Sequence, residues 1–434
     1  MPLGDLLTGS RVMKELRKWH KISKYSEEKI HELAYTKLLK LLNFATQYVP
    51  FYAQFSNSKA NNPYEWIKNF PIMYKRDVKQ HLNKLTSVPN DRLILELTGG
   101  SSGVRGIALK SKLDISRERA LILLIWSWAG YYPGKPILQT GMSLKRGFIK
   151  SIKDFLLRTK YYNAFNLNES DIKLLLQEQV GKKKFHLAGY ASSLYVIADT
   201  YLRLGMTDVK FDKAISLASK MFPHYRKRIK EAFGCDVIDT YGLSEGFIIG
   251  AQKDIEYYYI LSPHVFIEII DEQGNEVKDG ELGYVVATSL DAYAMPFIRY
   301  YTGDMAVKLP KSRYPANREM NFPLLEKIIG RDTDFVRTRS GKILVVEYFS
   351  AICEFFPEIY QFRVIQRNLD EIEIEYIPDE KFSEETLKSI GHQIHDYLKE
   401  DFPIIWRKVD VILSTTSGKP QIIQSFLKNE QLKN

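Results

Sequence analysis

The sequence predicts an α/β fold with a large N-terminal domain, residues 1–330, and a small α+β C-terminal domain, residues 331–434. Three observations lead to this prediction. The chain has 434 residues, 45% of them hydrophobic, which is enough for a large core and a smaller second one. Strand and helix patterns alternate through the first half, as in layered α/β folds with a largely parallel sheet. The pattern then changes near His264 and again near Gly330.

Helices are expected first, over residues 11–49, where apolar side chains recur at spacings of three and four until Pro50 ends the pattern. We then expect short apolar strands and one intervening helix. The strands lie in RLILELT (92–98), KPILQTG (135–141), KFHLAGY (184–190) and CDVIDTYG (235–242), and the helix in PHYRKRIKEAFG (223–234).

The second half of the chain shows two different sequence patterns. From His264 to Leu290, strands are joined by turn residues, which predicts an antiparallel β subdomain. Beyond Gly330, residues 360–378 predict two strands joined by a turn, and residues 383–402 predict an amphipathic helix. The segment RKVDVILS (407–414) completes this small α+β unit.

Composition excludes several classes of protein. Cys235 and Cys353 are the two cysteines, which rules out a disulfide framework and a structural zinc site built from several cysteines. The sequence has no run of about 18 apolar residues. Its first residues, MPLGDLLTGSRVMKEL, have no apolar stretch behind a basic start. We therefore expect neither a membrane span nor a secretory signal, and a cytoplasmic protein.

The net charge of +10 is compatible with anionic partners. Much of the excess lies in Lys145–Lys160, where the apolar side chains share one helical face. We expect a surface helix with that face on the core. Peripheral contact with a membrane or an anionic glycan, or a clamp for an anionic substrate, are the alternatives. Nucleic acid is not expected as a partner because no binding motif accompanies the charge, and the oligomeric state stays open.

One stretch, ELTGGSSGVRG at residues 96–106, is rich in small residues. Glycine lets the main chain approach phosphate oxygens, and short hydroxyls donate to them, so a bound polyphosphate is the first interpretation. An ordinary Gly/Ser turn is the alternative. The glycine spacing fits neither a Walker loop nor the dinucleotide fingerprint.

Four further stretches matter because of their order along the chain. They are DTYGLSEG (239–246), IRYYTGDMAV (298–307), IIGRDTDFVRTRSGK (328–342) and STTSGKPQ (414–421). Each alone is compatible with a turn or a solvated side chain. Together they resemble the core motifs of the adenylate-forming superfamily, the acyl-CoA synthetases and their relatives. The Gly/Ser stretch then resembles the phosphate loop of that superfamily.

Within the superfamily, the chain is most similar to the phenylacetate-CoA ligase-like branch, including the CapK-type proteins of capsular polysaccharide biosynthesis. The resemblance extends over nearly the whole chain. It includes the stretches YVPFYAQ (48–54), WIKNFPIMYKRDV (66–78), HVFIEIID (264–271) and MPFIRYYTGD (295–304). It implies an acyl-CoA synthetase-like fold whose small C-terminal domain is a mobile cap that carries a catalytic lysine.

The resemblance implies roles for the motif residues. Lys419 would bridge the substrate carboxylate and the α-phosphate of ATP, and Ser244 would lie near that phosphate. Glu245 would hold Mg²⁺. Asp304 would accept both ribose hydroxyls with help from Arg331. The remaining positions implied to bind ATP are Thr98, Gly100, Ser101, Ser102, Gly103, Asp239, Thr240, Gly242 and, against adenine, Tyr241.

The resemblance also places the carboxylate pocket and the hinge. His186, Gly189, Tyr190 and Phe247 would line the pocket. His186 and Tyr190 favour a polar or aromatic acid, although a histidine with its partners inside a strand is the alternative for His186. The hinge of the mobile domain would lie within Asp332, Thr333 and Asp334.

The implied reaction is ATP-dependent activation of a carboxylic acid to an acyl adenylate, with release of pyrophosphate. The acyl group would then pass to an acceptor, a CoA-type thiol first and otherwise an amine or hydroxyl of a sugar or amino acid. ATP, Mg²⁺ and CoA are the implied cofactors. A non-catalytic nucleotide- or glycan-binding relative is a further alternative. The sequence names neither the acid nor the acceptor.

Overall fold

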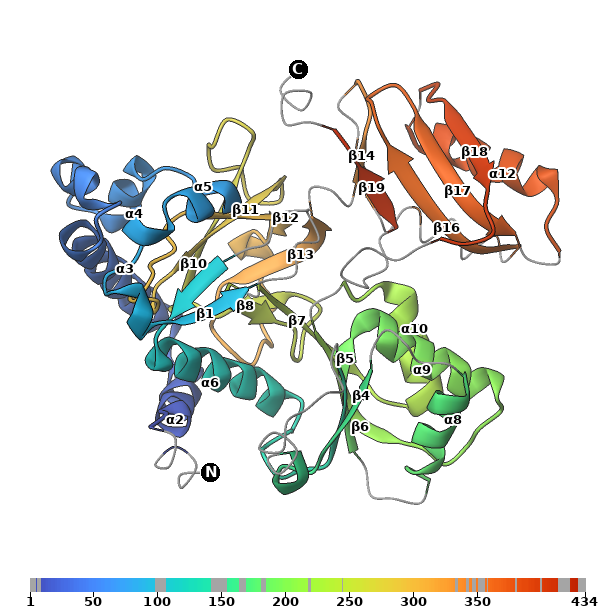
Figure 1. Ribbon diagram of the computed structural model, residues 1–434, viewed down its shortest axis with the longest axis horizontal. Helices are drawn as coiled ribbons and strands as arrows, with labels where there is room; N and C mark the ends of the chain where they lie inside the picture. Colours follow the sequence, from blue (N-terminus) through green and yellow to red (C-terminus); the bar gives the residue numbers. More distant parts are fainter. Residues whose placement is uncertain are drawn as a thin grey trace.

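The computed structural model confirms the mixed α/β class: a large eleven-stranded sheet carries helices, and a small α+β domain with a four-stranded sheet follows it in the chain (Figure 1). The structure describes residues 5, 9–97, 107–141, 154–163, 169–180, 185–217, 220–243, 245–331, 335–340, 343–345, 349, 356, 358–378, 381–398, 400–412 and 422–427.

Two long helices lie in the described residues 12–48, as the apolar spacing predicts. They are α2 (Val12–Ile22) and α3 (Glu27–Tyr48). Ser26 caps α3, because its hydroxyl accepts a hydrogen bond from the N–H of Lys29. Short helices follow: η1 (Ala53–Ser58), α4 (Pro63–Trp66), η2 (Ile67–Asn69), α5 (Lys75–Gln80), η3 (Leu82–Lys84) and η4 (Asn90–Arg92). Figure 1 shows this group together on one side of the large sheet.

A hairpin of two short strands comes next, formed by β1 (Ile94–Leu97) and β2 (Ile107–Lys110). The strands pair antiparallel with Leu97 opposite Ile107, so residues 98–106 connect the two paired ends. Helix α6 (Lys112–Trp128) begins directly after β2, where Ser111 and Asp114 form a capping box.

The first half of the large sheet is parallel. Its strands lie in the order β4-β3-β5-β6-β7. Their bounds are β3 (Ile137–Gly141), β4 (Thr159–Asn163), β5 (Phe185–Tyr190), β6 (Phe211–Leu217) and β7 (Val237–Leu243). The connecting helices are α8 (Glu169–Gln177), α9 (Ala191–Arg203) and α10 (Pro223–Phe233). The strands and the helix predicted in this region are confirmed.

The second half of the sheet is antiparallel, in the order β7-β8-β9-β13-β12-β11-β10. The bounds are β8 (Phe247–Ala251), β9 (Tyr258–Ile260), β10 (Val265–Ile270), β11 (Leu282–Ser289), β12 (Tyr300–Lys308) and β13 (Leu324–Arg331), with η5 (Lys311–Arg313) between the last two. The predicted antiparallel region is therefore continuous with the parallel strands, because β7 pairs with β6 on one side and with β8 on the other.

In the described part of the small domain, helix α12 (Glu384–Leu398) packs on a sheet of order β18-β17-β16-β19. The strands are β16 (Ile359–Gln366), β17 (Ile372–Pro378), β18 (Ile404–Lys408) and β19 (Ile423–Ser425), and β14 (Phe335–Arg337) pairs with β15 (Ile343–Val345). The segment 407–414, expected to complete this unit, shares its first two residues with β18. Ile404–Lys408 pairs in parallel with Ile372–Tyr376 of β17.

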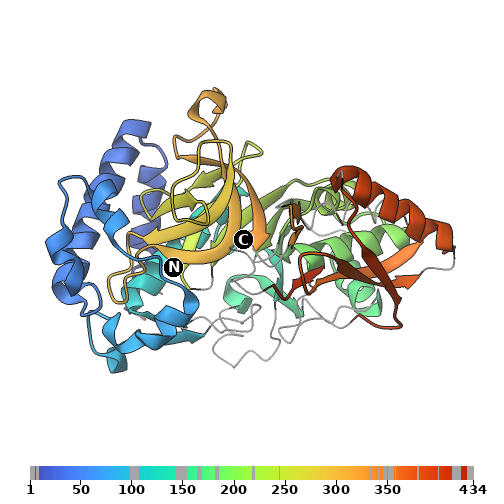
Figure 2. The same ribbon diagram turned by 90° about the horizontal axis from the view of Figure 1, so that it is seen from above.

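The two parts contact each other beside α10. Phe222, which precedes α10, is buried in the same apolar cluster as Ile390 of α12. Arg337 also forms an ion pair with Glu272 at 2.5 Å. Figure 2 shows the small domain next to the helices of the parallel half and away from the N-terminal helices. The division at residue 330/331 stays a prediction, and β13 extends to Arg331.

In the described part of the segment Lys145–Lys160, residues 154–156 are helical, as expected, and the helix does not continue beyond them. Thr159 and Lys160 belong to β4, because Thr159 pairs with Ile137 of β3. Phe155 and Leu156 are 82% and 69% exposed, so these two side chains do not pack on the core.

No helix within the described ranges is long and apolar enough to cross a membrane.

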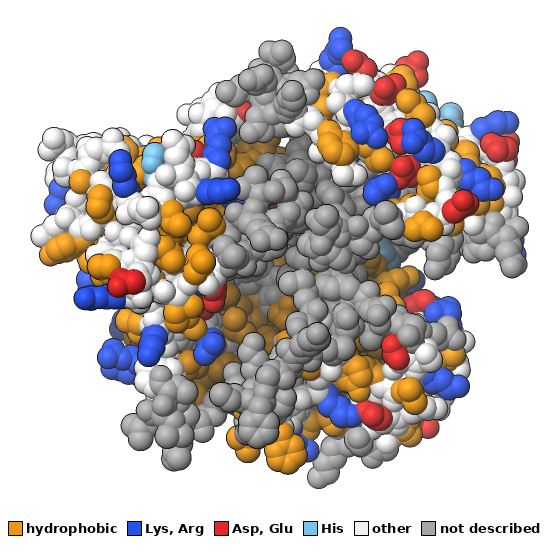
Figure 3. Space-filling model, viewed as in Figure 1, with side chains coloured by type: hydrophobic (Ala, Val, Ile, Leu, Met, Phe, Trp, Pro, Cys, Tyr) orange, Lys and Arg blue, Asp and Glu red, His pale blue; other side chains and the backbone are white. Residues whose placement is uncertain are grey.

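Acidic and basic side chains are interspersed over the small domain on the face drawn in Figure 3.

Candidate active site

The candidate site lies where β7 ends and the chain turns back into β8. Ligands of open α/β sheets bind at the carboxyl ends of parallel strands. Gly242 packs so closely on β8 that a Cβ atom would lie 2.6 Å from the carbonyl oxygen of Phe247. Gly246 closes the turn with a φ of +108° and donates its N–H to the carbonyl oxygen of Leu243. Both glycines of the 239–246 motif are therefore needed for the backbone path.

Glu245 is the buried carboxylate of this turn and is 7% exposed. The hydroxyl of Tyr300, on β12, donates to its Oε1 atom at 2.9 Å, and Nζ of Lys75, on α5, lies 4.0 Å from the same oxygen. Burial and the Glu245 carboxylate raise the pKa of Tyr300, so its hydroxyl keeps the proton that it donates. The Tyr300 ring stacks on Phe247 with centroids 5.7 Å apart, which fixes the direction of this hydrogen bond.

Asp304, also on β12, lies beside Tyr241. The Tyr241 hydroxyl donates to Oδ2 of Asp304 at 2.8 Å, and the Asp304 backbone N–H donates to the hydroxyl of Thr302 at 3.1 Å. Arg331 stands opposite Asp304 in the pairing of β12 with β13. The motifs at 239–246 and 298–307 thus contact each other twice, through Tyr241 with Asp304 and through Tyr300 with Glu245.

Asp239 and Thr240 make their contacts within the sheet. The Tyr258 hydroxyl donates to the Asp239 carboxylate, and burial raises the pKa of that carboxylate. The Thr240 hydroxyl donates to the carbonyl oxygen of Ser216 at 2.7 Å. These contacts tie β7 to β6 and β9 just before the chain reaches Tyr241 and Glu245.

Gly189 and Tyr190 lie at the carboxyl end of β5, the position expected of pocket residues. A Cβ atom at Gly189 would lie 1.8 Å from the hydroxyl oxygen of Thr140, which is itself 2.6 Å from the Ser193 hydroxyl. Burial raises the pKa of Tyr190. Phe247 is fully buried against Tyr300 and Phe297, so it shapes the site by supporting Tyr300.

His186 lies apart from the other predicted pocket residues, which departs from the expectation. It sits near the amino end of β5, is 1% exposed, and its Nε2 atom is 3.0 Å from the carbonyl oxygen of Ala129. Burial lowers the pKa of His186 and favours the neutral ring. The amino and carboxyl ends of a strand lie at opposite ends of a parallel sheet, so His186 is distant from the end where Gly189 and Tyr190 lie. Because it is also buried, it belongs to the core.

Several predicted site residues lie outside the described part of the chain. These are Thr98, Gly100, Ser101, Ser102, Gly103, Ser244, Asp332, Thr333, Asp334, Lys419 and the side chain of Arg331.

Sequence reasoning missed two residues that contact the site, Lys75 and Tyr300. Both lie inside stretches that carry the resemblance, 66–78 and 295–304, but no local pattern pairs either of them with Glu245. Only the packing of α5 and β12 on the β7–β8 turn makes these contacts.

Glu245 suits a magnesium ion whose other coordination positions are filled by phosphate and water oxygens. No group of three or more His, Cys, Asp or Glu side chains able to hold a metal exists among the residues that the structure describes. Mg²⁺ commonly binds proteins through one or two carboxylates plus substrate phosphates, so a single buried carboxylate fits this ion.

Comparison with known proteins gives a consistent result. Residues 335–425 match the family described as the CapK C-terminal domain. Protein CapK of Staphylococcus aureus is 23% identical over 377 residues, which cover 83% of this chain and 81% of that protein. The phenylacetate-coenzyme A ligase of Thermus thermophilus is 23% identical over 396 residues, which cover 85% and 84%.

Solved structures share the fold. A crystal structure of 2-hydroxyisobutyryl-CoA ligase in the postadenylation state aligns with a TM-score of 0.70 at 17% identity, over 94% of this chain and 91% of that one. The amide bond synthetase McbA from Marinactinospora thermotolerans aligns with a TM-score of 0.53 at 15% identity, over 76% and 68%. The chain is therefore homologous to CapK and to the phenylacetate-CoA ligases, and it has the fold of the adenylate-forming ligases.

Proposed function

We propose that this protein activates a carboxylic acid with ATP, forming an acyl adenylate and pyrophosphate, and then transfers the acyl group to an acceptor. The observation that carries the proposal is the double contact between the motifs at 239–246 and 298–307. Through it, the buried carboxylates of Glu245 and Asp304 are each fixed by a tyrosine hydroxyl next to the turn from β7 into β8. Homology to the phenylacetate-CoA ligases supports it.

The two carboxylates have different tasks in this proposal. Asp304 offers two oxygens to the two ribose hydroxyls of ATP, with Tyr241 against the base. Glu245 holds Mg²⁺, which when bound neutralises charge on the phosphates. Lys75 lies on the Glu245 side of the site and adds positive charge where the phosphates would bind. The residues 98–103 and Ser244 complete the phosphate contacts in the proposal.

Activation then proceeds by attack of a carboxylate oxygen of the acid on the α-phosphorus. The new P–O bond forms as the bond to the bridging β-phosphate oxygen breaks, and pyrophosphate leaves. All reacting groups are anions, so orientation and charge compensation supply most of the catalysis. Lys419 supplies the positive charge between the substrate carboxylate and the α-phosphate, carried by a C-terminal domain that moves about Asp332–Asp334.

Acyl transfer follows when an acceptor attacks the carbonyl carbon, AMP leaves and the acceptor loses a proton. A CoA-type thiol is the first acceptor to test, because the phenylacetate-CoA ligases are homologues. An amine or hydroxyl of a sugar or amino acid is the second, and the shared fold with an amide bond synthetase supports including it. The acid itself is best sought among polar and aromatic acids, given Tyr190 at the carboxyl end of β5.

Acid-dependent exchange between ATP and labelled pyrophosphate tests the proposal. A panel of aryl, fatty, amino and uronic acids should include at least one that supports exchange. Glu245→Gln and Asp304→Asn should each lower it on the order of 10²-fold. Glu276→Gln is the matched control, because Glu276 pairs with Lys308 on the surface. If no acid of the panel supports exchange, the result would instead favour a nucleotide- or glycan-binding protein without catalysis.

The acceptor is identified by a second measurement. AMP release with the active acid is compared in the presence of CoA and in the presence of amines. Faster release with CoA alone indicates a thioester ligase, and faster release with an amine alone indicates an amide synthetase.

A further inference from the structure

A buried lysine joins both strands that flank the phosphate-loop residues to helix α6. Nζ of Lys110, on β2, lies 2.5 Å from Oε2 of Glu96 on β1 and 2.9 Å from Oε2 of Glu118 on α6. The Lys110 side chain is 6% exposed and that of Glu118 is 18% exposed. We name Glu96, Lys110 and Glu118 the Lys110 clasp. Glu96 stands two residues before the segment 98–106, and β2 begins directly after it.

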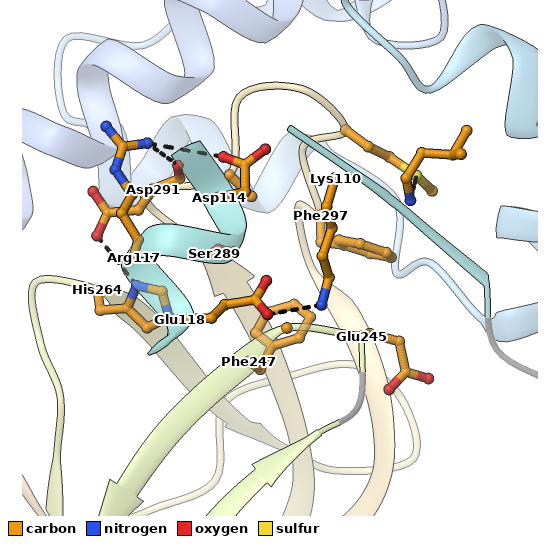
Figure 4. A pocket seen from close by; sticks show the side chains of 14 residues that line it. Lys110, Asp114, Arg117, Glu118, Glu245, Phe247, His264, Ser289, Asp291 and Phe297 are labelled. Atoms are coloured by element: carbon orange, nitrogen blue, oxygen red, sulfur yellow. Dashed lines mark hydrogen bonds and ion pairs between the residues drawn. The ribbon is translucent and has the colours of Figure 1, made fainter. Parts of the chain in front are cut away.

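The Lys110 clasp rests against the turn that carries Glu245. A Cβ atom built at Gly246 would lie 2.3 Å from Oε1 of Glu118 and 2.9 Å from Nζ of Lys110. An added side chain would therefore displace the ends of Glu118 and Lys110, and the φ of +108° at Gly246 also favours glycine. In Figure 4, Lys110 and Glu118 point toward each other beside the turn, and the Glu245 carboxylate points away from them.

The space beside the Lys110 clasp is too small for a substrate. The cavity is lined by polar side chains that include Arg117, His264 and Asp291, but it holds only about 20 Å³, room for one water molecule. Arg117 and His264 are both directed to Asp291 (Figure 4). Among the described residues, the clasp therefore faces a small cavity that Glu245 also lines.

Stability alone does not account for this charge cluster, in which Lys110 and Glu118 are largely buried and the Glu96 side chain is 41% exposed. Apolar residues of similar volume often replace a buried ion pair at no cost in stability, or with a gain, whereas losing one partner leaves an unpaired buried charge. A geometric role remains, because the clasp joins three elements, β1, β2 and α6, and touches a fourth, the Glu245 turn.

We infer that the Lys110 clasp is a positioning unit for Mg·ATP, which holds the base of the phosphate loop against the turn that carries Glu245. Its residues bind no substrate atom themselves. They fix the distance between the loop that would receive the β- and γ-phosphates and the carboxylate that would hold the metal ion. The inference rests on the proposed function, because it assigns those two roles to the loop and to Glu245.

Four variants test the inference, each measured for Mg·ATP binding by calorimetry and for the KM of Mg·ATP and of the acid in pyrophosphate exchange. Lys110→Met removes the charge at similar volume, and Lys110→Arg retains it. Gly246→Ala pushes a methyl group toward the clasp and also strains the turn itself, because φ is +108°, so its result is read only together with that of Lys110→Met. Lys37→Met is the matched control, because Lys37 is another buried lysine paired with a carboxylate, at 2.7 Å from Asp291.

Lys110→Met and Gly246→Ala should weaken Mg·ATP binding and raise its KM by roughly tenfold or more, the usual effect of losing a partner that orients a ligating group. The KM of the acid should stay within about twofold of the wild type. Lys110→Arg should recover most of the binding. Lys37→Met should lower the melting temperature without changing the KM of Mg·ATP.

Three outcomes overturn the inference. Wild-type Mg·ATP affinity in folded Lys110→Met refutes it and leaves the proposed function standing. An equal rise in the two KM values refutes it as well, because that is a general loss of structure. If the wild type does not bind Mg·ATP, both the inference and the proposed function fail. If the wild type binds Mg·ATP without supporting exchange, only the proposed function fails.

Discussion

Replacing Tyr300 by phenylalanine removes a single oxygen from the ring that orients Glu245. The ring itself keeps its stacking on Phe247 at 5.7 Å and its edge contact with Phe297 at 5.2 Å, so the packing is preserved. What is lost is the hydrogen bond of 2.9 Å to a carboxylate that is 7% exposed. Lys75, at 4.0 Å, remains as the other neighbour of that carboxylate.

The magnitude follows from the charge and burial of the acceptor. A hydrogen bond to a charged group contributes about 1.5–3 kcal/mol. Since about 1.4 kcal/mol is a factor of ten, the Tyr300→Phe variant should bind Mg·ATP roughly 10- to 100-fold more weakly if the whole loss falls on the orientation of Glu245. The free energy of unfolding should also fall, by about 1–3 kcal/mol.

Calorimetric titration with Mg·ATP and urea unfolding measure these two quantities. Tyr301→Phe is the matched control: Tyr301 is the next residue of β12, and its ring contacts Tyr74 and Tyr284 instead of Glu245. The reasoning is refuted if Tyr300→Phe binds Mg·ATP as tightly as the wild type, or if Tyr301→Phe weakens binding to the same extent.

Glu118→Gln should flatten the pH dependence of stability: burial raises the pKa of Glu118 from 4.5 to about 7, so the folded state holds this proton more tightly than the unfolded chain. The free energy of unfolding of the wild type should therefore fall as the pH rises from 4.5 to about 7, by at most about 3 kcal/mol. Urea titrations of the wild type and of Glu118→Gln measure this difference. Gly189→Ala should lower that free energy by about 1–3 kcal/mol, since the new atom would lie 1.8 Å from the Thr140 hydroxyl oxygen. Gly391→Ala, within α12, should raise it by up to about 1 kcal/mol, because the new atom would make an ordinary contact of 4.0 Å with Ile404. Phe222→Ala should speed limited proteolysis of the small domain, because it removes a buried ring worth about 3 kcal/mol, and Phe222→Leu should retain most of the protection.

Each of these predictions has an outcome that contradicts it. The first is wrong if Glu118→Gln keeps the wild-type pH slope, and the second if Gly189→Ala and Gly391→Ala change stability in the same direction. The third is wrong if both variants of Phe222 are cleaved at the wild-type rate.

The sequence by itself determined the elements and the motifs. Periodicities of two and 3.6 residues are local, so α2, α3, α10 and most strands of the parallel half could be predicted from them. The motif glycines were also readable, because Gly242 and Gly246 are required by the path of their own turn. Homology then supports the adenylate-forming interpretation of these motifs.

The tertiary structure decided which side chains meet. Tyr300 reaches Glu245, and Lys110 reaches Glu118 and the Gly246 turn, because the order of strands and the packing of α6 bring distant segments together. The surroundings of His186 match the alternative of a histidine inside a strand, which a local pattern does not distinguish from a pocket residue. The register of β18, with Ile404 opposite Ile372 of β17, is likewise a pairing between distant segments. Contacts between distant residues depend on the arrangement of the whole sheet, which periodicity within one segment does not encode.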